Sequence, residues 1–191
     1  YLLSTFLSRL SNHRTDKYGG DLEARMRYPL EVIKAVRDTW PEEKAMSVKF
    51  NGTDWADGGF DGDDAVVYAR ALKEIGVDLV FLSGGGVSSS AKVPVGPSYQ
   101  LPYAERVKKD ANILAGAVGM IYSPHQAEAI IRDQQADFVG MARAFLFDPR
   151  WVQHAAVTLG EDVAYPPQYE RGSPSFWKPA QGFQTWNDIT D

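Results

Sequence analysis

The sequence predicts an α/β fold: the C-terminal half, about strands 5–8, of a (β/α)₈ barrel. Three observations predict it. Short apolar runs alternate with amphipathic stretches, which is typical of parallel βαβ units. Two successive apolar runs, within residues 112–119 and 136–143, end in glycine, as in the phosphate site after strands 7 and 8 of such barrels. The 191 residues fall short of the roughly 250 that a complete barrel needs.

The first elements are set by apolar spacing and by the residues that end each run. A helix is expected over residues 21–39, because apolar side chains recur there at helical spacing until Trp40-Pro41. A short strand follows over residues 46–50. The next helix, residues 62–75, has an apolar face made of Ala65, Val66, Ala69, Leu72 and Ile75.

The same alternation continues through the second half of the chain. The expected elements are strands at residues 77–82, 113–115 and 137–139, and helices at residues 99–109, 123–132, 141–147 and 149–159. Ser123 is a typical N-cap and Pro124 suits the first helical position. From Tyr165 the chain is rich in proline, glycine and aromatic residues with little periodicity. We therefore divide it into a barrel part, residues 1–164, and an irregular C-terminal arm, residues 165–191.

Composition excludes several classes of protein. The formal net charge is -5 without a long basic run, so a nucleic-acid partner is not expected. The chain has no cysteine, hence no disulfide or thiolate site, and its three histidines are too scattered for a metal site. No apolar run reaches the length of a membrane span and no signal-peptide pattern is present, so we expect a cytoplasmic protein. The first residue is Tyr1 rather than Met, and we expect a chain truncated at its N-terminus.

The glycine-rich strand ends predict an anion site. A strand that ends in glycine leaves backbone N–H groups uncovered at the next helix, where they can bind phosphate. Residues 116–119 and 140–143 both have this form, and the second delivers Arg143, whose planar guanidinium suits phosphate. The alternatives are left-handed turns that need glycine for their own geometry, and an arginine on a helix surface.

Two further features invite a functional interpretation. Lys49 lies between Val48 and Phe50 in a strand expected to be covered on both faces, where a charge is costly unless it faces a partner or ligand. The alternative is a lysine at a strand end that reaches solvent. Residues 83–86, Ser-Gly-Gly-Gly, would let the backbone approach a ligand, or would simply form a flexible turn.

Several motifs together resemble the old yellow enzyme family. Residues 2–20, which include the polar run 11–20, closely resemble the loop and helix after strand 4 of that family. The later motifs follow in the family's order: Ser-Val-Lys-Phe-Asn at 47–51, Ser-Gly-Gly at 83–85, Gly-Ala-Val-Gly at 116–119, Gly-Met-Ala-Arg at 140–143 and Pro-Gln-Tyr-Glu-Arg-Gly at 167–172. The last motif is similar to the bacterial, thermophilic-like branch.

The resemblance implies roles for particular residues. Tyr1 would bind substrate and donate a proton to its α-carbon, just after a histidine pair that precedes this chain. Lys49 occupies the place of an arginine near the flavin N1–O2 edge. It keeps the positive charge but lacks the bidentate hydrogen-bonding geometry of a guanidinium. Arg171 would bind substrate in a neighbouring subunit, so we expect a homo-oligomer formed through the arm. The remaining expected cofactor contacts are Ser83, Gly84, Ala117, Val118, Gly119, Ala142 and Arg143.

The implied activity is that of an FMN-dependent NAD(P)H oxidoreductase that reduces activated alkenes such as α,β-unsaturated carbonyl compounds. The isolated fragment is expected to be inactive, because half of the flavin pocket is missing. Two alternatives stay open. One is a flavin demethylase or dienoyl-reductase relative, although dienoyl-CoA reductase relatives carry an iron–sulfur cluster on cysteines that this chain lacks. The other is a non-catalytic phosphate-binding half barrel.

Overall fold

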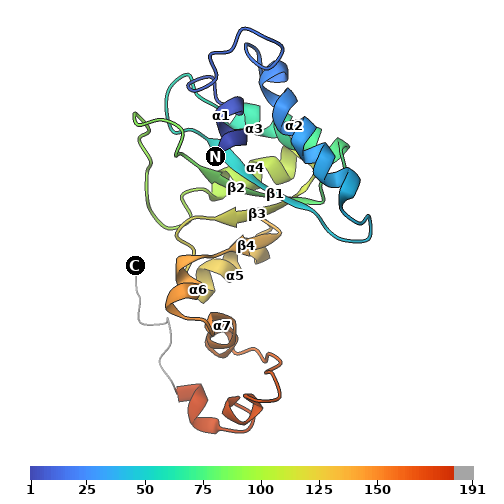
Figure 1. The fold of residues 1–191 in the computed structure, drawn as a ribbon. Helices are drawn as coiled ribbons and strands as arrows, with labels where there is room; N and C mark the ends of the chain where they lie inside the picture. Colours follow the sequence, from blue (N-terminus) through green and yellow to red (C-terminus); the bar gives the residue numbers. More distant parts are fainter. Residues whose placement is uncertain (183–191) are drawn as a thin grey trace.

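A four-stranded parallel sheet forms the centre of the protein (Figure 1). The computed structural model describes residues 1–182. The strands pair in chain order and all run parallel, and a helix follows each of them, as the sequence predicted. The strands are β1 (Ser47–Thr53), β2 (Leu79–Gly84), β3 (Leu114–Val118) and β4 (Phe138–Gly140). The helices are α1 (Leu2–Leu7), α2 (Leu22–Thr39), α3 (Gly62–Glu74), α4 (Leu101–Ala111), α5 (Pro124–Arg132), α6 (Arg143–Phe147) and α7 (Trp151–Leu159).

N-cap side chains mark the starts of α2 and α3, but the residue expected to cap α5 makes no capping hydrogen bond. The side chain of Asp21 accepts a hydrogen bond from Ala24 N at 2.8 Å and caps α2, and Asp61 caps α3 in the same way. Ser123 occupies the predicted N-cap position of α5, but its hydroxyl makes no capping hydrogen bond. Instead, Gln126 Oε1 accepts a hydrogen bond from Tyr122 N at 3.2 Å just before the helix.

The strands run further toward their C-terminal ends than the sequence predicted. β1 reaches Thr53 rather than residue 50, and β3 reaches Val118 rather than residue 115. The added residues pair with their neighbours, since Thr53 lies opposite Gly84 and Val118 lies opposite Gly140. Apolar runs alone gave the predicted strand ends, but ladder pairing across the sheet extends the strands into the polar and glycine residues that follow.

The hydrophobic core lies between one face of the sheet and the helices that cover it. Its strand side chains alternate with period two, as half-covered strands require. The fully buried members include Val80 and Leu82 of β2 and Leu72 of α3. Tyr68 of α3 packs edge-on against Phe50 of β1 with ring centroids 5.1 Å apart.

Within residues 1–182, the other face of the sheet is only partly covered. Lys49, Phe81, Gly116 and Phe138 lie opposite one another across the four strands and therefore share this face. Lys49 is exposed, so the expectation that its strand is covered on both faces is wrong for this chain. Within the described residues, β1 and β4 each pair on one side only, which is the arrangement expected of half a barrel.

The segment after α7 contains only short 3₁₀ turns among its described residues, at Glu170–Gly172 and Lys178–Gly182. It extends away from the sheet beyond α7 (Figure 1). The guanidinium of Arg150 lies 5.0 Å from the centre of the Tyr169 ring and joins this segment to the start of α7. The division of the chain at residues 164 and 165 stays a prediction, and residues 183–191 of the arm lie outside the described part. No helix within residues 1–182 is long and apolar enough to cross a bilayer.

Candidate functional site: a cationic cleft at the strand ends

A cleft of about 1320 Å³ opens where the four strands end. Each strand contributes to it at or beyond its C-terminal end, which is where (β/α)₈ proteins build their active sites. Helix α1 closes one side through its N-terminal residues. Eight of the predicted site residues line the cleft: Tyr1, Lys49, Ser83, Gly84, Val118, Gly119, Ala142 and Arg143.

Two cations supply all of the formal side-chain charge in the described lining. They are Lys49 on β1 and Arg143 at the start of α6, and no carboxylate faces the cleft. Neither side chain makes an ion pair with another described residue, in contrast to most arginines on α2, α3 and α4. Two unpaired positive charges above an otherwise neutral lining produce a positive potential, which attracts an anionic ligand.

The turn after β3 requires glycine for two reasons. Gly119 has a φ of +106°, a conformation that side chains rarely adopt. A Cβ atom at this position would also lie 2.5 Å from Nε2 of Gln100. At the end of β4, a Cβ on Gly140 would lie 2.8 Å from Cγ1 of Val118. Gly119 and Gly140 therefore place bare backbone at the two strand ends, as the phosphate-site prediction requires.

The Ser-Gly-Gly segment after β2 has a structural explanation. Asn51 joins it to β1, because its amide donates to Gly85 O at 2.9 Å and its Oδ1 accepts from Ser83 Oγ at 3.4 Å. A Cβ on Gly84 would lie 2.4 Å from Nε1 of Trp55. Gly84 is thus required by the packing of Trp55, whether or not a ligand approaches it.

Tyr1 lies at the mouth of the cleft. It is the N-cap residue of α1, and it is 90% exposed. Its ring stands against the loop after β2: a Cβ on Gly86 would lie 2.9 Å from Cε1 of Tyr1 and 3.5 Å from its hydroxyl oxygen. The fold therefore brings the first residue of the chain to the same cleft as Lys49 and Arg143.

Two predicted site residues do not line the cleft. The methyl group of Ala117 is fully buried in the core, so only its backbone could contribute to an anion site. Arg171 lies in the 3₁₀ turn Glu170–Gly172 of the arm and is exposed. Within one chain it stays outside the cleft, and its expected reach into a neighbouring subunit is a prediction.

Sequence reasoning missed Gln100, which lies beneath the Gly119 turn and lines the cleft. It is 5% exposed, and its Oε1 has no hydrogen-bond partner within residues 1–182. A buried amide oxygen without a partner costs roughly 1–3 kcal/mol, so such atoms are uncommon in native structures and call for an explanation. Gln100 falls just before a helix in a sequence with no distinguishing motif. The one available signal was its place in the loop after a strand that ends in glycine.

The fold and the cleft define a parallel α/β protein of the barrel type, with a positively charged cleft at the carboxyl ends of its strands. The model of the NADH:flavin oxidoreductase / NADH oxidase family matches residues 1–162, and the chain belongs to this family. The resemblance inferred from the sequence motifs is thereby confirmed.

Curated relatives carry the name NADPH dehydrogenase. The protein from Geobacillus sp. (strain WCH70) is 45% identical over 172 residues, and that from Bacillus subtilis (strain 168) is 40% identical over 172 residues. Each alignment covers 90% of this chain and 50% of the relative. The chain therefore spans about half the length of the curated relatives that it matches.

Solved structures of similar fold agree with this assignment. A 2-naphthoyl-CoA reductase complex superposes with a TM-score of 0.75 at 28% identity, over 84% of this chain and 25% of that one. Morphinone reductase superposes with a TM-score of 0.64 at 25% identity, over 87% of this chain and 43% of that one. The predicted fold class is confirmed by these likenesses and by the parallel sheet.

Proposed function

We propose that the complete protein is an FMN-dependent NAD(P)H oxidoreductase that reduces activated alkenes such as α,β-unsaturated carbonyl compounds. The observation that carries the proposal is the charge of the cleft: its described lining contains Lys49 and Arg143 and no carboxylate. A flavin mononucleotide needs positive charge at two separated places, at its phosphate and beside its reducible ring. Family membership and the NADPH dehydrogenase relatives support the same choice of cofactor and hydride donor.

The residues of the cleft fit the two ends of this cofactor. Arg143 and the bare backbone at Gly119 and Gly140 would hold the phosphate, and Gln100, whose Nε2 lies beneath the Gly119 turn, would donate a hydrogen bond to it. Lys49 comes from the opposite edge of the sheet, on β1, and would lie beside the ring. Between them, Phe81 and Val118 supply apolar surface.

The chemistry that FMN supplies when bound is hydride transfer from NAD(P)H to the substrate. The chain's own groups supply charge and a proton. Lys49 would stabilise negative charge on the reduced ring. The hydroxyl of Tyr1 would protonate the α-carbon of the alkene as general acid while hydride adds to the β-carbon, so that one hydride and one proton saturate the double bond.

The test is an anaerobic stopped-flow experiment on the complete gene product. We expect a yellow preparation whose flavin absorbance is bleached by NADPH and restored by N-methylmaleimide or 2-cyclohexenone. A yellow protein that is bleached but not restored by either alkene would refute the substrate class and favour a demethylase or dienoyl-reductase relative. A colourless protein that retains inorganic phosphate would refute the enzyme and favour a non-catalytic phosphate-binding module.

The proposal includes a homo-oligomer formed through the arm. Arg171 is exposed on a turn outside its own cleft, so it is available to a neighbouring copy. Analytical ultracentrifugation of the complete protein tests this, and a monomer at micromolar concentration would contradict it.

A further inference from the structure

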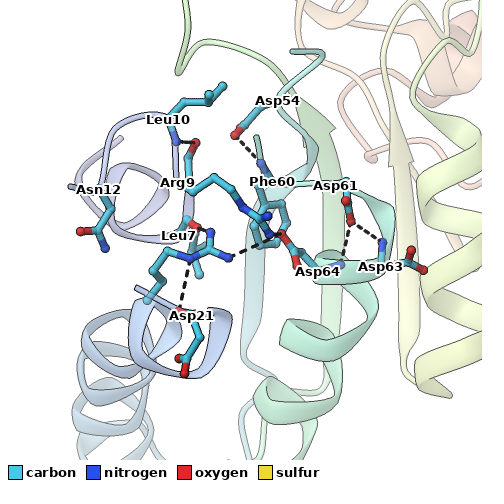
Figure 2. A network of polar contacts seen from close by, with 12 residues as sticks. Leu7, Arg9, Leu10, Asn12, Asp21, Asp54, Phe60, Asp61, Asp63 and Asp64 are labelled. Atoms are coloured by element: carbon cyan, nitrogen blue, oxygen red, sulfur yellow. Dashed lines mark hydrogen bonds and ion pairs between the residues drawn. The ribbon is translucent and has the colours of Figure 1, made fainter. Parts of the chain in front are cut away.

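A buried polar network holds the C-terminal end of α1 (Figure 2). The last carbonyl groups of a helix have no partner within the helix and need one elsewhere. The side-chain amide of Asn12 donates to Phe6 O at 2.7 Å, and the guanidinium of Arg25 donates to Leu7 O. The same amide of Asn12 donates to Tyr18 O at 2.7 Å, which fixes the loop that follows. Helix α1 has six residues, too few for stability of its own, so its position depends on these contacts together with the buried side chain of Leu7 and the packing of Phe6 on Tyr28, with ring centroids 4.4 Å apart.

Arg25 connects three helices through one charge. It comes from α2, is 1% exposed, and its Nε donates to Asp21 O at 3.3 Å. Its Nη2 lies 3.8 Å from Oδ2 of Asp64, in the first turn of α3, which Arg9 also approaches at 3.3 Å. A cation at the C-terminal end of α1 and a carboxylate at the N-terminal end of α3 are both favoured by the helix dipoles.

The network is costly to bury. Loss of hydration lowers the pKa of Arg25 and raises the pKa of Asp64, which means that burial disfavours the charged form of each side chain. Apolar side chains of similar volume often stabilise a protein as well as a buried ion pair does. Stability alone therefore does not account for a buried guanidinium at this place.

The opposite end of α1 carries Tyr1. The helix is continuous between the two ends: Thr5 N donates to Tyr1 O at 3.1 Å, and Ser8 N donates to Ser4 O at 3.1 Å. Six residues of helix are about 9 Å long, so a tilt of about 10° at the clamped end would move Tyr1 by about 1.5 Å. A displacement of about 1 Å of a reacting group can slow a reaction by about 100-fold.

We propose that Asn12, Arg25 and Asp64 form a clamp that positions Tyr1 for proton transfer, through the rigid helix α1. They are positioning residues, because none of them lines the cleft. The inference rests on the proposed function, in which Tyr1 is the proton donor. What is new is that the position of the Tyr1 hydroxyl is set by contacts at the opposite, C-terminal end of α1.

The test is a double-mutant cycle on the complete, flavin-loaded protein, with Arg25→Lys and Tyr1→Phe. Lysine keeps the charge but cannot reach Leu7 O, Asp21 O and Asp64 together. We expect flavin content and reduction by NADPH to change less than twofold, while reoxidation by 2-cyclohexenone slows about tenfold. In the Tyr1→Phe background, Arg25→Lys should have no further effect, because the group it positions is gone.

Arg37→Lys is the matched control. Arg37 also comes from α2 and donates to backbone carbonyls, those of Trp40 and Pro41, at 2.8 Å each, and it lies 4.0 Å from Asp78. It is near the other end of α2, away from α1, so its replacement should leave both half-reactions unchanged. Asn12→Ser removes the other side-chain contact to the end of α1 and should also slow reoxidation about tenfold. It provides the same test if the Arg25→Lys variant does not fold.

A second readout does not depend on turnover. Hydrogen exchange of amides within Leu2–Leu7 should accelerate at least tenfold in Asn12→Ser, with α2 and α3 unchanged. Equal slowing by Arg25→Lys in both backgrounds, or no slowing with either clamp variant, would overturn the inference while leaving the proposed function intact. An unaltered reoxidation rate in Tyr1→Phe would instead refute the proton donor, and the clamp's role with it.

Discussion

Replacing Arg143 by alanine should weaken FMN binding and leave riboflavin binding unchanged. In the proposed site the guanidinium contacts the phosphate, which riboflavin lacks. Because Arg143 is exposed and makes no ion pair with another residue of the described range 1–182, its removal breaks no ion pair there. Surface substitutions of this kind change stability by less than about 0.5 kcal/mol. A change in affinity can therefore be assigned to the ligand rather than to the fold.

The size of the effect follows from the type of contact. A hydrogen bond to a charged group contributes about 1.5–3 kcal/mol. At about 1.4 kcal/mol for each factor of ten, the FMN dissociation constant should rise by about 10- to 150-fold. The effect should be largest at low salt, because an exposed cation is screened as the ionic strength rises.

The assay is titration of the apoprotein with each flavin, followed by the quenching of flavin fluorescence at constant ionic strength. Arg150→Ala is the control, since Arg150 is an exposed arginine nearby that stacks on Tyr169 and does not line the cleft. If Arg143→Ala leaves the FMN constant unchanged, or weakens FMN and riboflavin equally, Arg143 is not a phosphate ligand.

Three further predictions concern other residues of the cleft. Lys49→Met should lower the flavin midpoint potential by on the order of 20 mV, since an exposed charge pair contributes roughly 1 kcal/mol. Spectroelectrochemical titration measures this potential, and an unchanged value would mean that Lys49 has a structural role only. Tyr1→Phe should slow reoxidation by an enone about 100-fold or more in stopped flow and leave NADPH-driven reduction unaltered; equal rates would mean that another group donates the proton. Gln100→Glu should weaken FMN binding at least tenfold more than riboflavin binding, because it places a carboxylate beside the phosphate turn. The control is Gln134→Glu, at an exposed position outside the cleft, which should affect neither flavin. Equal weakening of both flavins by Gln100→Glu would locate Gln100 away from the phosphate.

The alternation of strands and helices was readable from the sequence because it depends on local chemistry. Apolar periodicity located every helix from α2 to α7 to within two residues at each end. Asp21 and Asp61 mark their helices because a carboxylate can reach the free N–H groups of the first turn without help from the rest of the fold. The spacing of Gly140 and Arg143 likewise predicts an anion site from the local sequence.

The strand ends and the exposure of Lys49 could not be obtained in this way. The pairing of Thr53 with Gly84 depends on a neighbouring strand some thirty residues away, so glycine there continues a strand rather than ending it. Lys49 faces the partly covered side of the sheet because, within residues 1–182, the helices pack mainly on the other face. A pattern within a single strand contains no information on what lies across it.

The tertiary structure alone decided which residues share the cleft and what supports them. Gln100 joins the site because the loop before α4 folds beneath the Gly119 turn. Arg25 reaches the end of α1 because α1, α2 and α3 meet at one point, where a single guanidinium can contact all three. Residue types and local spacing determined the family and most of the charged site. Contacts between segments far apart in the chain determined its geometry, because a buried hydrogen bond depends on where two segments meet rather than on the sequence around either one.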